Sequence, residues 1–323
     1  MTAADIRRVA VIGAGTMGPD VAAIFARHGF DVRLMDAKAA ALERARGKVD
    51  EVYETLIDGG LMTKADADVG RDYLKFTLDR EEALSDVDFV VEAIPEKLGL
   101  KKALFREMEE EVREDTILAS NSSGIPVTKI AEAVRHPGRV IGTHWLNQPH
   151  VIPLIEVIKG EQTDAATVQA TRQLIERVEM ISVLIQGNVP GFIHNRILFV
   201  IYREVLHLLG AGLVSAEDID NVTKWAIGPK LTAIGPLEML DVAGLDVYQS
   251  IANYLNSDLD DSDEVSSVIR EKVGRGELGI KTGRGMYNYE SSELPALMQG
   301  RRQMMLDVVR MRLRSNSKGG AKR

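Results

Sequence analysis

The stretch Val9-Ala-Val-Ile-Gly-Ala-Gly-Thr-Met-Gly18 decides the fold of this chain. It is an apolar strand that runs into a GxGxxG pattern, and residues 21–28 continue it with the apolar periodicity of a helix. A second strand, 31–36, ends in the carboxylate of Asp36. A GxGxxG pattern alone is weak evidence, but here strand, glycines, helix and acid stand in the order that a βαβ dinucleotide-binding unit requires.

The three glycines and the acid each have a physical role in such a unit. Gly13 permits the tight turn, Gly15 lets the backbone approach a pyrophosphate, and Gly18 lets the helix pack on the strand. Asp36 would accept hydrogen bonds from ribose hydroxyls and repel a 2′-phosphate, so the unit predicts NAD rather than NADP. The alternative is a glycine-rich turn in another α/β domain. We expect the loop residues Gly13, Gly15, Thr16, Met17 and Gly18 to line the cofactor.

The composition limits the class of protein. A length of 323 residues suffices for two domains, and 45% hydrophobic with 27% charged residues is typical of soluble globular chains. A net charge of −8 argues against a nucleic-acid partner, and no apolar run approaches the roughly 20 residues of a membrane span. The absence of cysteine excludes disulfides and thiolate ligands. We therefore expect a cytoplasmic protein with no metal site and no signal peptide.

The remaining pattern predicts an α/β protein, with a Rossmann-type doubly wound sheet followed by an all-α C-terminal domain. We expect an NAD-binding domain over residues 1–188, interrupted by a helical excursion over 38–74. A helical domain for substrate binding and dimerisation follows over 189–290. Residues 291–323 predict a basic amphipathic helix and a disordered tail that begins near Ser315.

A histidine and a carboxylate stand in a β-rich apolar stretch, residues 140–158. His144 follows one predicted strand, and Glu156 is the only charged residue of the next, 152–158. A lone carboxylate is costly to bury unless it is paired. An imidazole partner would keep its other nitrogen as a general base near neutral pH. The alternative is a half-exposed glutamate and an unrelated loop histidine, and this stretch alone favours neither.

Polar residues follow two further strands, at the edge where parallel sheets bind ligands. Glu96 stands in the loop after the first, and Asn121-Ser-Ser-Gly124 follows the second. Clusters of this composition are also common as turns and helix caps. Lys97, Lys101 and Lys102 open the intervening helix, and as a cluster they are typical of solvated surface.

Together these motifs resemble the short-chain L-3-hydroxyacyl-CoA dehydrogenase family. The resemblance extends from residue 8 to about residue 289, and its segments follow the family's order. They are Gly13–Gly18, Val91–Glu96, Ala119–Gly124, Ile141–Asn147, Pro190–Arg196, Ile234–Asp246 and Gly279–Tyr287. The resemblance implies an NAD-dependent oxidoreductase that acts on a small-molecule substrate and forms a homodimer.

The resemblance also implies roles for individual residues. His144 and Glu156 would form the catalytic dyad, with Ser123 and Asn195 beside the reacting carbinol. Asn147 would lie near the nicotinamide. Further contacts to NAD would come from Asp36, Glu96, Lys101, Ser123 and Lys281.

The chain departs from the family where CoA is expected to bind. The family usually has a serine and a lysine-rich stretch there, which meet the CoA phosphates. The matching residues 49–60 are acidic, and only Lys64 nearby offers a positive charge, so this helix would repel phosphates. Two substrate classes therefore stay open: a 3-hydroxyacyl thioester, and a small free hydroxy acid, aromatic alcohol or aldehyde.

The second class resembles a sub-branch of the family that acts on free substrates, among them a pyridine-carboxylate aldehyde. In such a site Trp145 and His150 would wall a flat ring, and the alternative is that they are packing residues. A third possibility is a crystallin-like structural protein on the same scaffold. An intact set of dyad, serine and asparagine argues against it.

Overall fold

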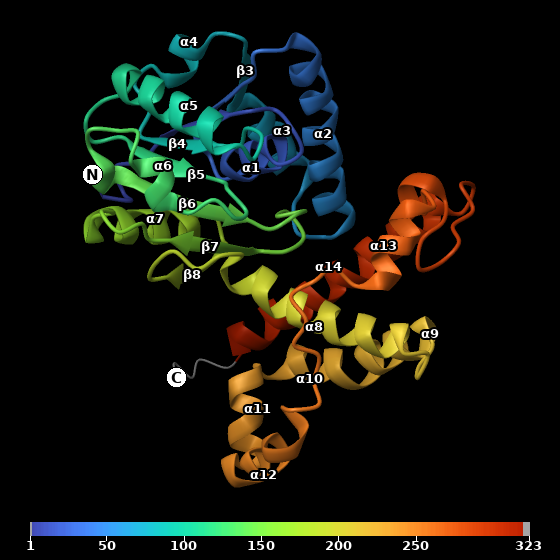
Figure 1. Cartoon of the computed structure of the whole chain (residues 1–323). Helices are drawn as coiled ribbons and strands as arrows, with labels where there is room; N and C mark the ends of the chain where they lie inside the picture. The colour runs from blue at the N-terminus through green and yellow to red at the C-terminus, as the bar shows by residue number, and fades with distance from the viewer. Residues whose placement is uncertain (1, 319–323) are drawn as a thin grey trace. The chain divides into compact units, whose positions relative to one another are not determined.

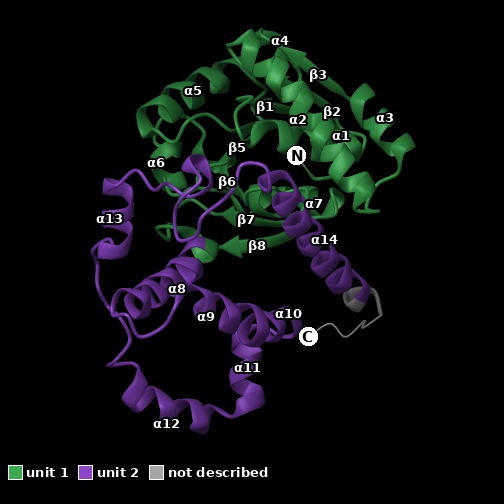
Figure 2. Cartoon of the chain, turned by 90° about the vertical axis from the view of Figure 1, so that its right-hand side faces the viewer, with its two compact units in different colours: residues 1–194 green, residues 195–323 purple. Residues whose placement is uncertain are grey.

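The chain consists of an α/β part and a helical part, as the sequence predicts. The computed structural model describes residues 2–318. It divides into two compact units, residues 1–194 and residues 195–323 (Figure 2). The first unit contains the sheet, and the second unit, as far as residue 318, consists of helices, turns and two isolated β-bridges within residues 279–288.

The first unit is built on one eight-stranded sheet in the order β3-β2-β1-β4-β5-β6-β7-β8 (Figure 1). Its strands are β1 (Arg8–Ile12), β2 (Asp31–Met35), β3 (Leu74–Thr77), β4 (Phe89–Glu92), β5 (Ile117–Ser120), β6 (Val140–Trp145), β7 (Leu154–Ile158) and β8 (Ile181–Ile185). Strands β1 to β6 are parallel, whereas β7 runs antiparallel to β6 and parallel to β8. Ligand sites in such sheets lie beyond the carboxyl ends of the parallel strands.

Helices cover both faces of this sheet. They are α1 (Gly18–Arg27), α2 (Ala39–Asp58), α3 (Lys64–Asp72), α4 (Arg80–Leu84), α5 (Leu98–Glu111), α6 (Val127–Ala131) and α7 (Ala165–Arg177). Alternate residues of a strand point to opposite faces. Val9 and Val11 accordingly join the core under α1, α2, α3 and α7, while Ala10 and Ile12 join the core under α4, α5 and α6. Burial on both faces explains why the strands are continuous apolar runs.

The second unit is helical over its described residues, as the sequence predicts. Its helices are α8 (Phe192–Gly210, which begins in the first unit), α9 (Ala216–Val222), α10 (Gly228–Ala233), α11 (Pro236–Ala243), α12 (Leu245–Leu255), α13 (Ser267–Gly274) and α14 (Leu294–Lys318). Helices α11 and α12 are separated at Gly244, whose φ of 96° suits only glycine. Helix α14 extends past Ser315 to Lys318, and the rest of the predicted disordered tail lies outside the described residues.

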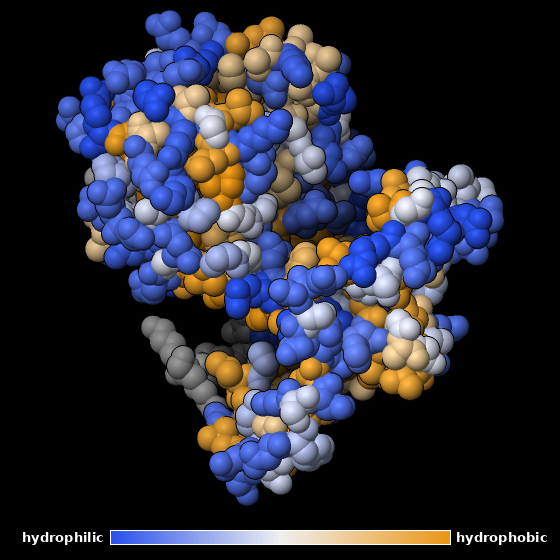
Figure 3. Space-filling view, viewed as in Figure 1, coloured by the Kyte–Doolittle hydropathy of each residue, from blue (hydrophilic) through white to orange (hydrophobic). Residues whose placement is uncertain are grey.

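The second unit leaves its apolar side chains uncovered. Between residues 195 and 314 only Leu306 is buried. Trp225 and Leu237 are 80% and 77% exposed, and Figure 3 shows apolar residues gathered on the visible surface. Exposed apolar area of this extent usually marks an interface. None of the described helices combines the length and apolarity needed to cross a membrane.

Candidate active site

The turn between β1 and α1 has the shape of a phosphate-binding loop. Gly13 adopts a φ of 111°, and a Cβ there would lie 2.6 Å from the carbonyl oxygen of Ala93. A Cβ on Gly18 would collide with the carbonyl of Gly13, whereas one on Gly15 would meet nothing within 4 Å. Gly13 and Gly18 therefore allow close contacts between backbone segments at this turn. Gly15 leaves open space beside the N-terminus of α1, a helix of ten residues.

Asp36 lies beside this turn, directly after β2. Its Oδ2 accepts a hydrogen bond from the N–H of Ala14 at 2.9 Å, and its Oδ1 accepts one from the N–H of Lys38 at 2.9 Å. The carboxylate is half-buried and fixed against the glycine turn. An open turn, a helix N-terminus and a carboxylate at the end of β2 together fit a dinucleotide with an unmodified ribose.

His144 and Glu156 face each other across two neighbouring strands. Strand β6 extends to Trp145, so His144 lies within the strand, and the antiparallel register places it directly opposite Glu156 of β7. Nδ1 of His144 lies 2.7 Å from Oε2 of Glu156, and both side chains are buried. Directly opposed residues of an antiparallel pair project from the same face, which explains their contact.

The second oxygen of Glu156 is also occupied. Oε1 accepts hydrogen bonds from the N–H groups of Ile193 at 2.9 Å and His194 at 2.8 Å, in the first turn of α8. Burial opposes ionisation, but the bonds from His144 and these two N–H groups outweigh it, so the pKa of Glu156 lies below its ordinary value. An ionised Glu156 requires the proton on Nδ1 of His144, which leaves Nε2 as the acceptor.

Ser123 lies in an exposed turn after β5, and Glu96 holds this turn. Oε1 of Glu96 accepts from the N–H groups of Ser123 at 2.9 Å, Gly124 at 3.0 Å and Ile125 at 3.3 Å, and from the hydroxyl of Ser122. Burial opposes ionisation of Glu96. The Ser122 hydroxyl, the nearby Lys101 and the turn's N–H groups outweigh burial, so the pKa of Glu96 is lowered.

Lys101 is completely buried, so the surface interpretation of its lysine cluster is wrong for this residue. Its Nζ donates to Oε1 of Glu92 at 2.6 Å and lies 3.3 Å from Oε2 of Glu96. The hydroxyl of Ser120 donates to the other oxygen of Glu92 at 2.6 Å. Sequence reasoning missed Glu92 and Ser120. An acid that ends the apolar run of β4 was the available signal, and it is the same signal that pointed to Glu156.

The other predicted site residues lie in three places. Asn147 is exposed in the loop after β6. Asn195 is the first residue of the second unit and follows His194 on α8. Lys281 lies in a short 3₁₀ turn of the second unit, Ile280–Thr282. The structure thus brings together the dyad within the first unit, and the roles of Asn147, Asn195 and Lys281 stay predictions.

Trp145 and His150 are packing residues in the structure. The indole of Trp145 is 3% exposed and meets the ring of Phe25 on α1 edge-on, with centroids 5.6 Å apart. His150 is also buried, and its Nδ1 lies 3.7 Å from Oδ1 of Asp20, in the first turn of α1. Trp145 therefore attaches the end of β6, and His150 the loop after it, to the helix that follows the glycine turn.

The protonation of buried Asp20 should make the stability of the folded protein depend on pH. Burial raises the pKa of Asp20 to about 6, so the folded state holds this proton more tightly than the unfolded chain does. The protonated Asp20 side chain therefore makes its full contribution to the stability of the folded state below about pH 4. This contribution is lost as the pH rises through about 6. Asp20→Asn should therefore stabilise the apoprotein by about 1–3 kcal/mol at pH 8 and have little effect at pH 4.

Chemical denaturation of wild type and Asp20→Asn across this pH range measures the difference. Asp58→Asn, at an exposed acid of α2, is the matched control and should change little at any pH. A loss of stability in Asp20→Asn at pH 8 would instead mean that Asp20 is ionised and stabilised by His150.

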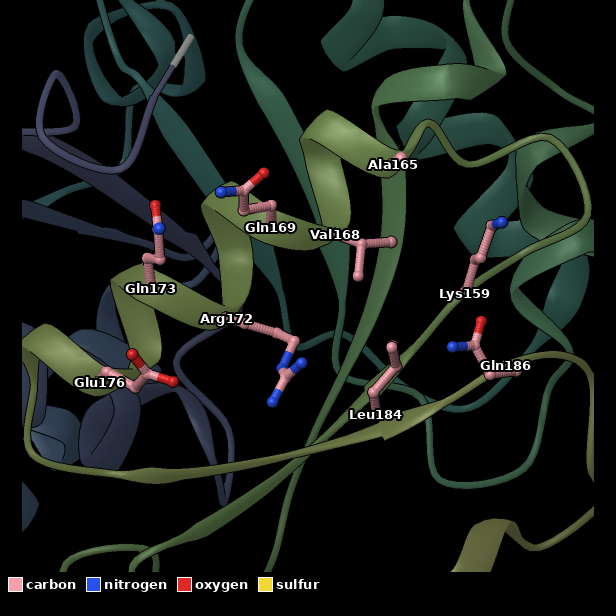
Figure 4. Close-up of a pocket in the computed structure, with 9 residues that line it drawn as sticks. All are labelled: Lys159, Ala165, Val168, Gln169, Arg172, Gln173, Glu176, Leu184 and Gln186. Atoms are coloured by element: carbon pink, nitrogen blue, oxygen red, sulfur yellow. The ribbon is translucent and has the colours of Figure 1, made fainter. Parts of the chain in front are cut away.

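A groove of about 440 Å³ opens between α7 and the edge strand β8 (Figure 4). It is lined by charged and amide side chains, among them Lys159, Arg172 and Glu176. Figure 4 shows Arg172 extending from α7 toward the strand, where its Nε donates to the hydroxyl of Ser182 at 3.2 Å. None of the predicted site residues lines this groove, so it is separate from the dyad and the glycine turn.

Two family models match almost the whole chain. The NAD-binding domain of 3-hydroxyacyl-CoA dehydrogenase matches residues 8–189, and the C-terminal domain of 3-hydroxyacyl-CoA dehydrogenase matches residues 191–289. The first model contains the glycine turn and the dyad. The second begins at the start of α8 and ends before α14, so α14 lies beyond the family's two domains.

Similar proteins include dehydrogenases of free and of CoA-bound substrates. The 5-formyl-3-hydroxy-2-methylpyridine 4-carboxylate 5-dehydrogenase of Mesorhizobium japonicum is 41% identical over 95% of this chain and 98% of its own length. A probable 3-hydroxybutyryl-CoA dehydrogenase of Deinococcus radiodurans is 36% identical over 86% of this chain and 99% of its own length.

Solved structures agree with both comparisons. The crystal structure of a 5-formyl-3-hydroxy-2-methylpyridine 4-carboxylic acid 5-dehydrogenase, described as an NAD⁺-dependent dismutase, superposes with a TM-score of 0.88 at 40% identity, covering 95% of this chain and 98% of that one. The (S)-3-hydroxybutyryl-CoA dehydrogenase of Ralstonia eutropha gives 0.74 at 34% identity, covering 89% and 100%. This chain belongs to the 3-hydroxyacyl-CoA dehydrogenase family and is an NAD-dependent oxidoreductase.

Proposed function

We propose that this dehydrogenase acts on a small free aldehyde or hydroxy acid, of which a pyridine-carboxylate aldehyde is the leading candidate, and that His144 is its base. The proposed type of reaction rests on the buried contact of 2.7 Å between Nδ1 of His144 and Oε2 of Glu156. The substrate class is supported by the similarity to the pyridine-carboxylate dehydrogenase over 95% of the chain.

The chemistry follows from the protonation of the dyad. Nε2 of His144 takes the hydroxyl proton of the substrate, and NAD, when bound, would supply the acceptor for the hydride of the carbon that bears this hydroxyl. Glu156 stabilises the imidazolium that results. Ser123 and Asn195 donate hydrogen bonds to the oxygen while its charge changes. With an aldehyde, His144 first removes a proton from the water that adds to the carbonyl carbon and returns it to the former carbonyl oxygen, and the neutral hydrate then reacts as an alcohol.

The surface of α2 supports a substrate without CoA. Its second half exposes four carboxylates, those of Asp50, Glu51, Glu54 and Asp58. Lys48 is already paired with Glu51 at 3.2 Å, so this surface offers phosphates little positive charge. CoA carries several negative phosphate charges, which an acidic helix repels.

The choice between NAD and NADP is tested at Asp36. Wild-type protein should bind NADH at least tenfold more tightly than NADPH, because the carboxylate repels a 2′-phosphate. Asp36→Ala should weaken NADH binding by about 10- to 100-fold, as expected for a lost charged hydrogen bond, and reduce the preference. Fluorescence titration measures both constants. Asp31→Asn, at the opposite end of β2, is the control, and equal wild-type binding of NADH and NADPH would remove the proposed role of Asp36.

The substrate class is tested by a direct comparison of two reactions. We expect 5-formyl-3-hydroxy-2-methylpyridine-4-carboxylate with NAD⁺ to be used with a kcat/KM at least about 100-fold above that of acetoacetyl-CoA with NADH. Preference for the thioester would restore the CoA alternative. Tight NADH binding with no turnover of either substrate would instead favour the crystallin-like structural role.

The similarity to a dismutase suggests a second reaction at the same site. We propose that one aldehyde is oxidised to its acid and a second is reduced to its alcohol, with the cofactor recycled between them. His144 takes a proton in the first half and returns it to the alcohol oxygen in the second. With NAD⁺ at one-tenth of the aldehyde concentration, acid and alcohol should form in equal amounts. Acid formed only in proportion to NADH would show simple dehydrogenation.

A homodimer in the cytoplasm completes the proposal. Uncovered helices such as α8, with Phe199 67% exposed and Val200 58% exposed, need an apolar partner, and a second copy provides one. Light scattering should give twice the chain mass of 35.5 kDa, and a monomer at micromolar concentration would contradict it. The absence of cysteine is in keeping with a reducing compartment.

A further inference from the structure

The residue that begins α8 has a backbone conformation that its side chain disfavours. Phe192 adopts a φ of 54°, in the left-handed region that favours glycine. A bulky residue in this region is rare, and it persists only where the surrounding contacts hold it in place. Phe192 is 1% exposed, so those contacts come from within the protein. They involve both members of the dyad, through the backbone that follows Phe192 and through its ring.

The backbone after Phe192 is directed at Glu156. The N–H of Phe192 donates to the carbonyl oxygen of Val189 at 2.9 Å, which closes a turn. The next two N–H groups, those of Ile193 and His194, donate to Oε1 of the carboxylate at 2.9 and 2.8 Å. The first N–H groups of a helix have no partner within the helix, so this turn presents two free donors to Glu156. A change of φ at Phe192 would direct these donors elsewhere.

The ring of Phe192 lies against the imidazole of His144. The two ring centroids are 5.3 Å apart, and the ring planes are inclined by 51°. Phe192 belongs to the apolar core that also contains Val140 and Ile158. These two residues lie on the same face of β6 and β7 as the dyad, so the phenyl ring excludes water from one side of the imidazole. Glu156 attracts an imidazolium more strongly where water is excluded.

We propose that Phe192 is a positioning residue for the dyad. Its backbone directs two N–H groups at Glu156, and its ring holds the imidazole of His144 in place and shields it from water. The proposal rests on the proposed function, because it requires His144 to be the base. Phe192 itself takes no part in proton transfer. Helix α8 continues into the second unit at Asn195, so the residue that begins this helix also positions the dyad of the first unit.

Three substitutions separate the ring of Phe192 from its backbone. Phe192→Leu keeps an apolar side chain over the imidazole and should retain kcat within about threefold of wild type. Phe192→Gly removes the ring but favours the left-handed φ, and it should lower kcat by roughly tenfold. Phe192→Ala removes the ring and is disfavoured at this φ, so it should lower kcat by roughly 30-fold or more. The Kd of NADH should stay within about threefold of wild type in all three variants, because the glycine turn and Asp36 are unchanged.

Phe105→Ala is the matched control for lost packing. Phe105 is as deeply buried as Phe192 and belongs to the same core, but it lies on α5. This variant should lose stability to chemical denaturation, as Phe192→Ala does, because both leave a cavity in the core. It should nevertheless keep kcat within about threefold of wild type.

Two results of these assays would overturn the proposal. One is a loss of kcat in Phe105→Ala as large as that in Phe192→Ala, because loosened packing would then explain the effect. The other is a kcat within about threefold of wild type in both Phe192→Gly and Phe192→Ala. If Phe192→Ala does not fold, Phe192→Gly and Phe192→Leu provide the same comparison.

NMR spectroscopy of His144 tests the positioning without any assay of activity. The proton on Nδ1 lies in the buried contact with Glu156, so it should exchange slowly with water in the wild type. This exchange should become roughly tenfold faster or more in Phe192→Gly and Phe192→Ala, and keep its rate in Phe192→Leu and Phe105→Ala. Unchanged exchange in both variants that lack the ring would overturn the proposal. Faster exchange in a protein that turns over no substrate would keep the positioning role of Phe192 and reject the proposed function instead.

Discussion

Replacement of His144 by alanine is expected to lower kcat by about 10²- to 10⁴-fold and leave the Kd of NADH within a factor of about two. In the proposed mechanism the imidazole takes the substrate proton, whereas the glycine turn and Asp36 follow other strands, β1 and β2. Steady-state kinetics and NADH titration measure the two effects separately.

The control for this variant is His136→Ala. His136 also pairs with a buried glutamate, Glu109, at 3.2 Å, but its side chain is 58% exposed, and it precedes β6 rather than lying opposite β7. It should keep kcat within about twofold of wild type. Near-normal turnover by His144→Ala would mean that another group is the base.

Glu156→Gln is expected to have the second largest effect, a loss in kcat of about 10²- to 10⁴-fold. A glutamine amide placed at the imidazole donates to Nδ1 and so favours the proton on Nε2, the nitrogen that accepts the substrate proton in the proposed mechanism. The same tautomer argument explains the large loss when the aspartate of a serine-protease triad becomes asparagine. Glu161→Gln, at an exposed acid after β7, is the control.

The stability of Glu156→Gln should depend on pH in a defined direction. Because the pKa of Glu156 is lowered in the folded state, its stabilisation is present above about pH 4 and is lost as the pH falls below that. The variant should therefore be less stable than wild type at pH 7, and the difference should shrink in acid. A difference that grows on acidification would contradict the assignment of an ionised Glu156.

The fold could be predicted largely from periodicity. The spacing of apolar residues depends directly on which side chains face the core and which face solvent. It therefore indicates the βαβ unit, the two-helix excursion and the helical second part. The extent of β6 could not be predicted, because Thr143 and His144 are polar and yet buried, and only pairing with β7 explains them. The separation of α11 from α12 could not be predicted. A single glycine within a helical pattern does not show that the backbone adopts a positive φ there, as it does at Gly244.

The site could be predicted in part. Glu156 was found as a lone acid in an apolar strand, and the family resemblance supplied its pairing with His144. The amides of Ile193 and His194 could not be found, because backbone donors have no side-chain signature. Lys101 has the same surroundings in sequence as Lys97 and Lys102, and its burial depends on its contact in space with Glu92.

The proposed function requires the dyad of His144 and Glu156 to lie beside the nicotinamide of bound NAD. A crystal structure of the NAD⁺ complex tests it most directly. We expect the nicotinamide ring to lie next to Nε2 of His144, with only a small substrate between them. A nicotinamide bound away from His144, with the imidazole closed off by protein, would contradict it.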